Sequence, residues 1–183
     1  MAASHKQKDQ NEVLTNLHPS RYKERSNHLE HSMQITIDPL TSADIIGLLQ
    51  QHLDDMYANS PAESIHALDL DKLRQPEITF WSARQDGELL GCLALKVLDS
   101  DHAELKSMRT APAARGKGVA SSLLQYALAQ AAERGIRQVS LETGTMDYFT
   151  AARSLYRKFG FVSCEPFADY TLDPNSAFMT LHL

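Results

Sequence analysis

The sequence predicts a mixed α/β fold built around a mostly antiparallel central sheet, and two local patterns carry this prediction. Two runs of strand-forming residues meet at Asp86-Gly87, a dipeptide typical of tight hairpins between antiparallel strands. Residues 104–143 follow the order strand, glycine loop, helix, strand, a crossover that places its two strands parallel. Both kinds of strand pairing are therefore expected in one sheet.

The composition is that of one globular domain. The chain has 183 residues, of which 43% are hydrophobic, enough for a sizeable core. No apolar run approaches the roughly 18 residues that span a bilayer, so no membrane partner is expected. The net charge is −5 and the basic residues are scattered, which argues against a nucleic-acid partner. Cys92 and Cys164 lie far apart without metal-like spacing, which indicates reduced thiols in a cytoplasmic protein.

Residues 1–32 differ from the rest of the chain. They are polar, contain four histidines, and lack the charged start and apolar run of a secretory signal. We expect a disordered polar tail or leader here, followed by one domain over residues 33–183. The histidines have no sharp ligand spacing, so no metal site is expected.

The domain is expected to begin with a short strand and a helix. Residues 35–37 are strand-like and are followed by Asp38-Pro39, which breaks the strand. Thr41 or Ser42 can cap the helix. The helix positions that share one face are Ile45, Leu48, Leu49, His52, Leu53 and Met56. We expect His52 to be a histidine at the edge of the core, and residues 59–75 to form a loop with a short helix.

The next three strands are expected to be antiparallel. Residues 78–84 and 88–98 form the hairpin, and a third strand begins near His102 and ends at Thr110. Residues 99–101 supply the turn between the second and third of these strands. Pro112 then ends the third strand.

The glycine loop Arg115-Gly116-Lys117-Gly118-Val119-Ala120 leads into the clearest helix of the chain. Its apolar residues are Val119, Ala120, Leu123, Leu124, Ala127, Leu128 and Ala131, at helical spacing. Bare amides at a helix start attract anions, and the two basic residues of the loop add charge, so the loop suits a pyrophosphate. The Walker and dinucleotide-binding patterns do not match the glycine spacing.

The last third of the chain is expected to hold three strands and a helix. Gly135 ends the long helix, and residues 138–143 form a strand. Ala152, Leu155, Tyr156 and Phe159 share one face of a second helix, which ends at Gly160, and Phe161-Val162 begins a further strand. The last strand, residues 177–183, could pair within the sheet or across a homodimer.

Two motifs together resemble a known superfamily. Arg-x-x-Gly-x-Ala at residues 115–120 and Ala-x-x-Leu-Tyr-x-x-x-Gly-Phe at residues 152–161 are similar to the acetyl-CoA motifs of the GCN5-related N-acetyltransferases (GNAT). The resemblance covers residues 34–183 and extends to small bacterial acetyltransferases that share the sequence Leu-Glu-Thr-Gly after the long helix. One departure is Phe149, where many members carry Asn, which puts in doubt the polar contact credited to that Asn.

The resemblance implies a fold and a cosubstrate. The sheet would carry helices on both faces and a splayed strand pair at the acetyl-CoA site. The backbone at Met108 and Thr110 would pair with the pantetheine arm, and an amide near one of them would polarise the thioester carbonyl. The residues that would hold the pyrophosphate are Arg115, Gly116, Lys117, Gly118, Val119 and Ala120. No metal is implied.

The resemblance also implies direct acetyl transfer to an amine in a ternary complex. Tyr156 matches the general acid that protonates the departing thiolate. Glu104 and Glu142 are the two candidates for a base that receives the amine proton, directly or through water; a water chain alone could also suffice. Glu142 with Asp147, Tyr148 and Phe149 suits a cationic or aromatic amine at the mouth of the pocket.

The acceptor stays open at this point. A small-molecule amine is favoured, and protein N-termini or lysines are the alternatives. A different class of function, a non-catalytic acyl-CoA-binding module, would keep the glycine loop while Tyr156 and the two glutamates did no chemistry.

Overall fold

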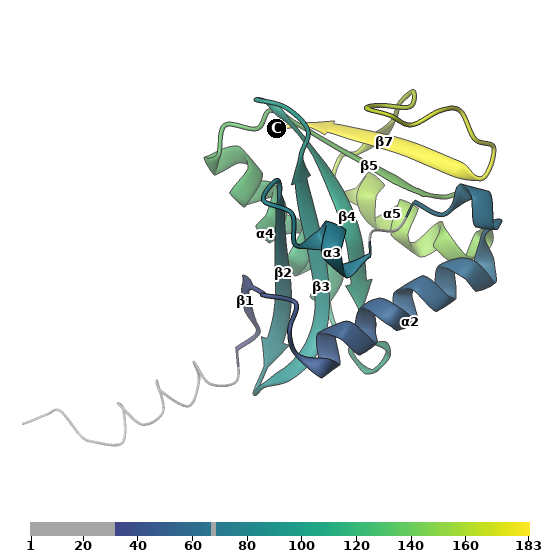
Figure 1. Cartoon of the computed structure of the whole chain (residues 1–183). Helices are drawn as coiled ribbons and strands as arrows, with labels where there is room; N and C mark the ends of the chain where they lie inside the picture. The colour runs from purple at the N-terminus through teal and green to yellow at the C-terminus, as the bar shows by residue number, and fades with distance from the viewer. Residues whose placement is uncertain (1–31, 67–68) are drawn as a thin grey trace, which may run out of the picture.

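The computed structural model describes residues 32–66 and 69–183. Within these residues, seven strands form one sheet in the order β1-β2-β3-β4-β5-β7-β6 (Figure 1). The strands and their bounds are β1 (Gln34–Ile37), β2 (Ile78–Gln85), β3 (Glu88–Val97), β4 (His102–Thr110), β5 (Gln138–Gly144), β6 (Val162–Ser163) and β7 (Ser176–His182). In the described sheet, β4 and β5 are parallel and the other neighbours are antiparallel. The expected mixed, mostly antiparallel sheet is confirmed.

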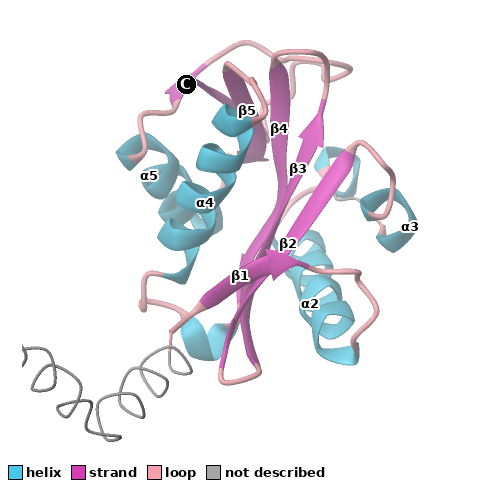
Figure 2. Ribbon diagram, turned by 90° about the vertical axis from the view of Figure 1, so that its left-hand side faces the viewer, coloured by secondary structure: helices cyan, strands magenta, loops and turns pink. Residues whose placement is uncertain are grey.

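Helices cover both faces of the sheet (Figure 2). The helices are α2 (Ala43–Asn59), α3 (Leu70–Leu73), α4 (Val119–Glu133) and α5 (Thr150–Lys158). The apolar residues of α4 and α5 join Trp81, Leu93 and Leu105 in the larger core. Those of α2 and α3 join Phe80 and Ala94 in a second core on the opposite face. Alternate strand residues thus serve two cores, which explains the long apolar runs in β2 and β3.

Local backbone chemistry accounts for the turns and ends of these elements. Asp86 and Gly87 both have positive φ, 51° and 82°, as a two-residue hairpin of the predicted kind requires. Asp99 Oδ1 accepts hydrogen bonds from the amides of Asp101 and His102 and closes the turn before β4. Gly135 and Gly160, with φ of 81° and 92°, follow α4 and α5 as expected.

The start of α2 differs in detail from the expectation. Ser42 takes the N-cap position but caps no backbone amide. Its hydroxyl donates to Asp44 Oδ1, and that carboxylate instead accepts from the amide of Ile45. Arg84 pairs with the same carboxylate at 2.6 Å. An acid of the first turn, and not the side chain at the N-cap, therefore accepts the hydrogen bond from a backbone amide at the start of α2.

The C-terminal strand lies inside the sheet. β7 pairs with β5 along its whole length and with β6 at Val162 and Ser163. The tail predicted for residues 1–32 lies, apart from Ser32, outside the described residues. No helix in the described part of the chain is long and apolar enough to cross a membrane. Short 3-10 turns at Ala62–Ser64, Pro112–Ala114 and Asp147–Phe149 complete the chain.

Candidate active site

The glycine loop has the geometry of an anion receptor. Gly116 and Gly118 have φ of 75° and 81°, a region that favours glycine, and Gly118 is the N-cap of α4. The first helical hydrogen bond after the loop runs from the Ser122 amide to the Gly118 carbonyl, at 3.0 Å, so the three preceding amides have no partner within the helix. Within α4, the first turn carries no acidic side chain. Arg115 and Lys117 are exposed beside these amides.

The parallel strands β4 and β5 separate partway along their length. They pair from His102–Gln138 to Leu105–Leu141, after which β4 continues along β3 and β5 continues along β7. A bulge in β4 lies at this point, because its register with β3 shifts between Cys92 and Ala94. Ser107, in the bulge, has a φ of 52°. The inner edges of β4 and β5 beyond Leu105 are therefore unpaired with each other, as the predicted splay requires.

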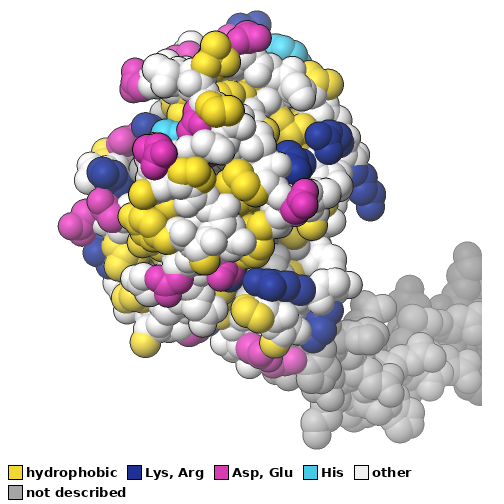
Figure 3. Space-filling view, turned by 90° about the vertical axis from the view of Figure 1, so that its right-hand side faces the viewer, with side chains coloured by type: hydrophobic (Ala, Val, Ile, Leu, Met, Phe, Trp, Pro, Cys, Tyr) yellow, Lys and Arg dark blue, Asp and Glu magenta, His cyan; other side chains and the backbone are white. Residues whose placement is uncertain are grey.

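A groove of about 340 Å³ lies along the far end of β4. Met108, Thr110, Arg115 and Ala120 line it, so four of the predicted cosubstrate contacts meet there. Gly116, Lys117 and Gly118 do not line the groove. The side chain of Val119 is buried in the core, so only its backbone can face a ligand. The side of the molecule on which α2 ends carries hydrophobic side chains across its middle (Figure 3).

A smaller cavity of about 110 Å³ adjoins the groove at the splay. The two spaces share five lining residues, which are His52, Met108, Phe149, Ala152 and Tyr156. The Tyr156 hydroxyl lies 3.5 Å from Met108 Sδ, at the boundary between them. Glu104 and Glu142 line the smaller cavity, so all three predicted catalytic side chains meet in one space.

The two carboxylates have different surroundings. Glu104 is 3% exposed, and its Oε1 accepts hydrogen bonds from Lys106 Nζ at 2.9 Å and from the Tyr170 hydroxyl at 2.6 Å. Burial raises the pKa of Glu142 above its ordinary value. Burial also raises the pKa of Tyr156, so its phenol keeps its proton at neutral pH. The cavity thus holds one ion-paired carboxylate, one carboxylate of raised basicity and one protonated phenol.

Phe149 has a packing role at the position where many GNAT members carry Asn. Its ring covers Gly144 so closely that a Cβ built on that glycine would lie 2.3 Å from Phe149 Cδ2. The ring also meets that of Tyr148 edge-on, with centroids 5.0 Å apart. Phe149 lines both the groove and the smaller cavity, so the absence of a side chain at Gly144 leaves room for a wall that the two spaces share.

Sequence reasoning missed a polar cluster beside the groove. Asp55 of α2 accepts hydrogen bonds from Arg109 Nη2 and, at 2.7 Å, from the Tyr148 hydroxyl. Arg109 is 9% exposed, and its Nε has no hydrogen-bond partner. The partners are 54 and 93 positions apart in sequence, so no local pattern could have indicated them.

His52, which was expected to lie at the edge of the core, lines both spaces. Burial, and then the positive charge of Arg109, lower its pKa to about 4. The imidazole is therefore neutral at neutral pH. Helical spacing predicted its place on the apolar face of α2, but it could not show that the side chain lines the two spaces.

Comparison with known proteins agrees with the family resemblance of the two motifs. A model of the Acetyltransferase (GNAT) family matches residues 46–161. An uncharacterized N-acetyltransferase of Bacillus subtilis, YsnE, is 56% identical over 151 residues, which are 82% of this chain and 100% of YsnE. Escherichia coli YedL, also an uncharacterized N-acetyltransferase, is 51% identical over 149 residues, 81% of this chain and 94% of YedL.

Solved structures match the same region. A Klebsiella pneumoniae protein described as an acyl-CoA N-acyltransferase is 30% identical with a TM-score of 0.70, covering 84% of this chain and 99% of its own. A GNAT acetyltransferase of Elizabethkingia anophelis, solved with acetyl-CoA bound, is 18% identical with a TM-score of 0.59, covering 82% of this chain and 98% of its own. At this lower identity the likeness concerns the fold alone. Within residues 32–66 and 69–183, no group of three His, Cys, Asp or Glu side chains is arranged to hold a metal ion.

Proposed function

This chain belongs to the GNAT family and is an N-acetyltransferase, and we propose that it transfers the acetyl group of acetyl-CoA directly to an amine, most readily a small molecule. One observation supports the proposal: the groove beside the glycine loop and the cavity that holds the carboxylates adjoin, with Tyr156 among the five residues that line both. A thioester in the first space and an amine in the second would meet at that side chain.

Several features of the chain fit acetyl-CoA. The amides at the start of α4, with Arg115 and Lys117, suit the pyrophosphate. The unpaired edge of β4 at Met108 and Thr110 suits the amides of the pantetheine arm, which can pair with it as a strand would.

Acetyl transfer then requires two proton movements. The amine nitrogen forms a bond to the thioester carbon, the carbon–sulfur bond breaks, and the thiolate leaves. We assign Tyr156 to protonate that thiolate, because its phenol is protonated and lies at the junction of the two spaces. Burial disfavours the charged thiolate as it disfavours the charged phenolate. The pKa of the CoA thiol in this space would therefore rise together with that of the phenol.

We assign the receipt of the amine proton to Glu142 before Glu104. The raised pKa of Glu142 makes it more basic than an ordinary glutamate, whereas Glu104 Oε1 already accepts two hydrogen bonds. Glu104 remains a second candidate, acting through water. A cytoplasmic location is part of the same proposal, and the free thiols of Cys92 and Cys164 are compatible with it.

The test combines ligand binding with thiol release. Acetyl-CoA and CoA should raise the melting temperature more than ATP does, and thiol should appear with at least one amine of a panel. Tyr156→Phe should lower kcat by about 10²- to 10⁴-fold with little change in the KM for acetyl-CoA. Tyr57→Phe, at a tyrosine that is 59% exposed and lines neither space, is the matched control.

The outcomes separate the alternatives. Stabilisation by CoA without thiol release for any amine, peptide N-terminus or lysine would favour the acyl-CoA-binding module. Full activity of Tyr156→Phe would remove Tyr156 as the acid and leave the fold assignment intact.

A further inference from the structure

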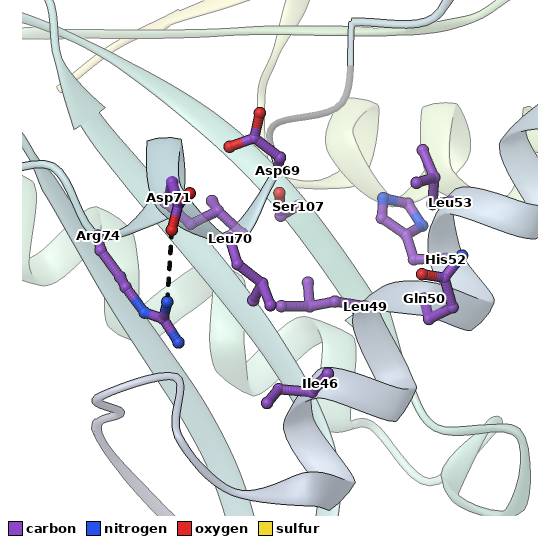
Figure 4. Close-up of a pocket in the computed structure, with 11 residues that line it drawn as sticks. Ile46, Leu49, Gln50, His52, Leu53, Asp69, Leu70, Asp71, Arg74 and Ser107 are labelled. Carbon is purple, nitrogen blue, oxygen red and sulfur yellow. Dashed lines mark ion pairs between the residues drawn. The ribbon is translucent and has the colours of Figure 1, made fainter.

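A third cavity, of about 390 Å³, lies between α2 and α3 (Figure 4). Its volume is in the range of roughly 300–1,000 Å³ that small-molecule sites occupy. The helix α2 lines one side and α3 the other, and Ser107 of β4 lies at the back between them. None of the steps proposed above uses this space.

The α2–α3 cavity adjoins the cavity that holds the carboxylates. His52 and Ser107 line both of them. The positive φ of Ser107 belongs to the bulge that lies where β4 leaves β5, so this bulge also lies at the boundary with the α2–α3 cavity. His52 and Ser107 are therefore the side chains past which a molecule with its amine beside Glu142 would have to extend.

The walls of the α2–α3 cavity are mainly apolar. Ile46, Leu49 and Leu53 are spaced along one face of α2, and Leu70 and Leu73 face them from α3. Leu73 is fully buried in the second core, and Leu49 and Leu70 pack against that core at the border of the cavity. An apolar group placed here would bury surface against an existing core.

Each charged side chain that lines the cavity already has a partner of opposite charge. Asp69 accepts from the Lys72 amide at 2.8 Å and lies 3.4 Å from Lys72 Nζ. Arg74 lies 3.6 Å from Asp71 Oδ1 and donates to the Leu40 carbonyl (Figure 4). Gln50 donates to Asp54. His52, whose pKa is lowered to about 4, adds no charge at neutral pH. The rim therefore offers no unpaired charge that calls for an opposite charge on a ligand.

We propose that the α2–α3 cavity binds the apolar tail of the acceptor, so that the acceptor is a primary amine with an alkyl or aryl tail. The proposal rests on the acetyltransferase function proposed above. It commits the cavity to the tail of the substrate because the cavity shares His52 and Ser107 with the space that holds the carboxylates.

The first test is a homologous series from ethylamine to hexylamine, with 2-phenylethylamine and 1,6-diaminohexane, followed by thiol release at saturating acetyl-CoA. Each added methylene should raise kcat/KM about fourfold while it enters the cavity. Hexylamine should exceed 1,6-diaminohexane by at least tenfold, because the diamine would place an unpaired ammonium among apolar walls. A constant kcat/KM along the series, or a preference for the diamine, would overturn the proposal.

The second test fills the cavity. Leu49→Trp should lower kcat/KM for hexylamine at least tenfold more than kcat/KM for ethylamine. Leu183→Trp makes the same exchange at a leucine that is 46% exposed and lines none of the three cavities, and it should leave both values unchanged. An equal effect of Leu49→Trp on both amines would show that the residue acts on the fold, and would contradict the proposal.

A binding measurement keeps the two proposals distinguishable. Calorimetry with the CoA complex should show hexylamine binding to the parent protein and at least tenfold weaker binding to Leu49→Trp. If no amine gave thiol release, the acetyltransferase mechanism would be overturned, whatever the calorimetry showed. Thiol release from ethylamine with no gain for longer tails would overturn the tail site alone. If a second copy of the chain occupied the cavity instead, kcat/KM would again not change with amine length. In that case the sedimentation coefficient of the protein would change on Leu49→Trp.

Discussion

Replacing Gly144 by alanine should damage catalysis more than stability. The new Cβ would lie 2.3 and 2.5 Å from two ring atoms of Phe149, whereas ordinary contact begins at 3.4 Å, so the ring must withdraw by roughly 1 Å. Overpacking of this kind costs about 1–3 kcal/mol of unfolding free energy, and the half-buried ring can move outward, which places the cost near 1 kcal/mol.

The catalytic loss should be larger because Phe149 forms a wall shared by both spaces at Tyr156. A displacement of about 1 Å near reacting groups can lower a rate by about 10²-fold, and we expect a loss of this order in kcat/KM for acetyl transfer. Thiol release gives the rate, and urea unfolding gives the stability. Gly47→Ala, at a glycine of α2 whose added Cβ would meet nothing within 4 Å, should instead raise the unfolding free energy by about 0.5–1 kcal/mol.

A double substitution isolates the cause. If the collision with the ring is responsible, Gly144→Ala should have little further effect once Phe149→Ala has removed the ring. An undiminished loss in the Phe149→Ala background would refute the reasoning, because Gly144 would then act through its own backbone.

Two further predictions concern the glycine loop and His52. Gly118 and Gly135 both have a φ of 81°, so replacing either by alanine should lower the unfolding free energy by about 1 kcal/mol. Only Gly118→Ala should also weaken acetyl-CoA binding. Equal acetyl-CoA affinities of the two variants in a titration would show that the loop is not part of the site. Because the folded pKa of His52 is about 4, below its ordinary 6.5, the unfolded chain binds this proton more tightly and stability is lost as the pH falls from 6.5 to 4. His52→Asn should reduce that loss, measured by urea unfolding at pH 7 and pH 4.5, by about 1–3 kcal/mol, and identical pH dependence in both proteins would contradict the lowered pKa.

Much of the fold could be predicted because its signals are local. Asp86-Gly87, the two loop glycines and the glycines after α4 and α5 each fix a backbone conformation within a few residues. The helical faces follow from spacing alone. The three proposed catalytic residues were predicted from the motif and from their positions on the strands, and in the structure all three line one cavity.

The parts that could not be predicted depend on contacts between distant segments. Tyr170 donates a hydrogen bond to Glu104, 66 positions earlier in the chain. Tyr170 lies in a segment without helix or strand, and its ring meets those of His66 and Phe167 edge-on. Nothing in the local sequence marks Tyr170 as a partner of a carboxylate. Likewise, the α2–α3 cavity exists because two helices separated by a loop leave a gap above Ser107, which helical spacing cannot show.

The bulge at Ser107 explains how groups from both faces of the sheet reach one space. Leu105 packs on the side of α4 and α5, and strict alternation would place Met108 on the opposite side. The extra residue reverses this order, so that Met108 meets the larger core and Tyr156, while Arg109 turns toward Asp55 of α2. Glu104, before the bulge, still faces the side of α2. Tyr156 and Glu104 can line one space because the pairing of β4 with β5 ends at Leu105–Leu141; a sheet that stayed paired beyond this point would separate them.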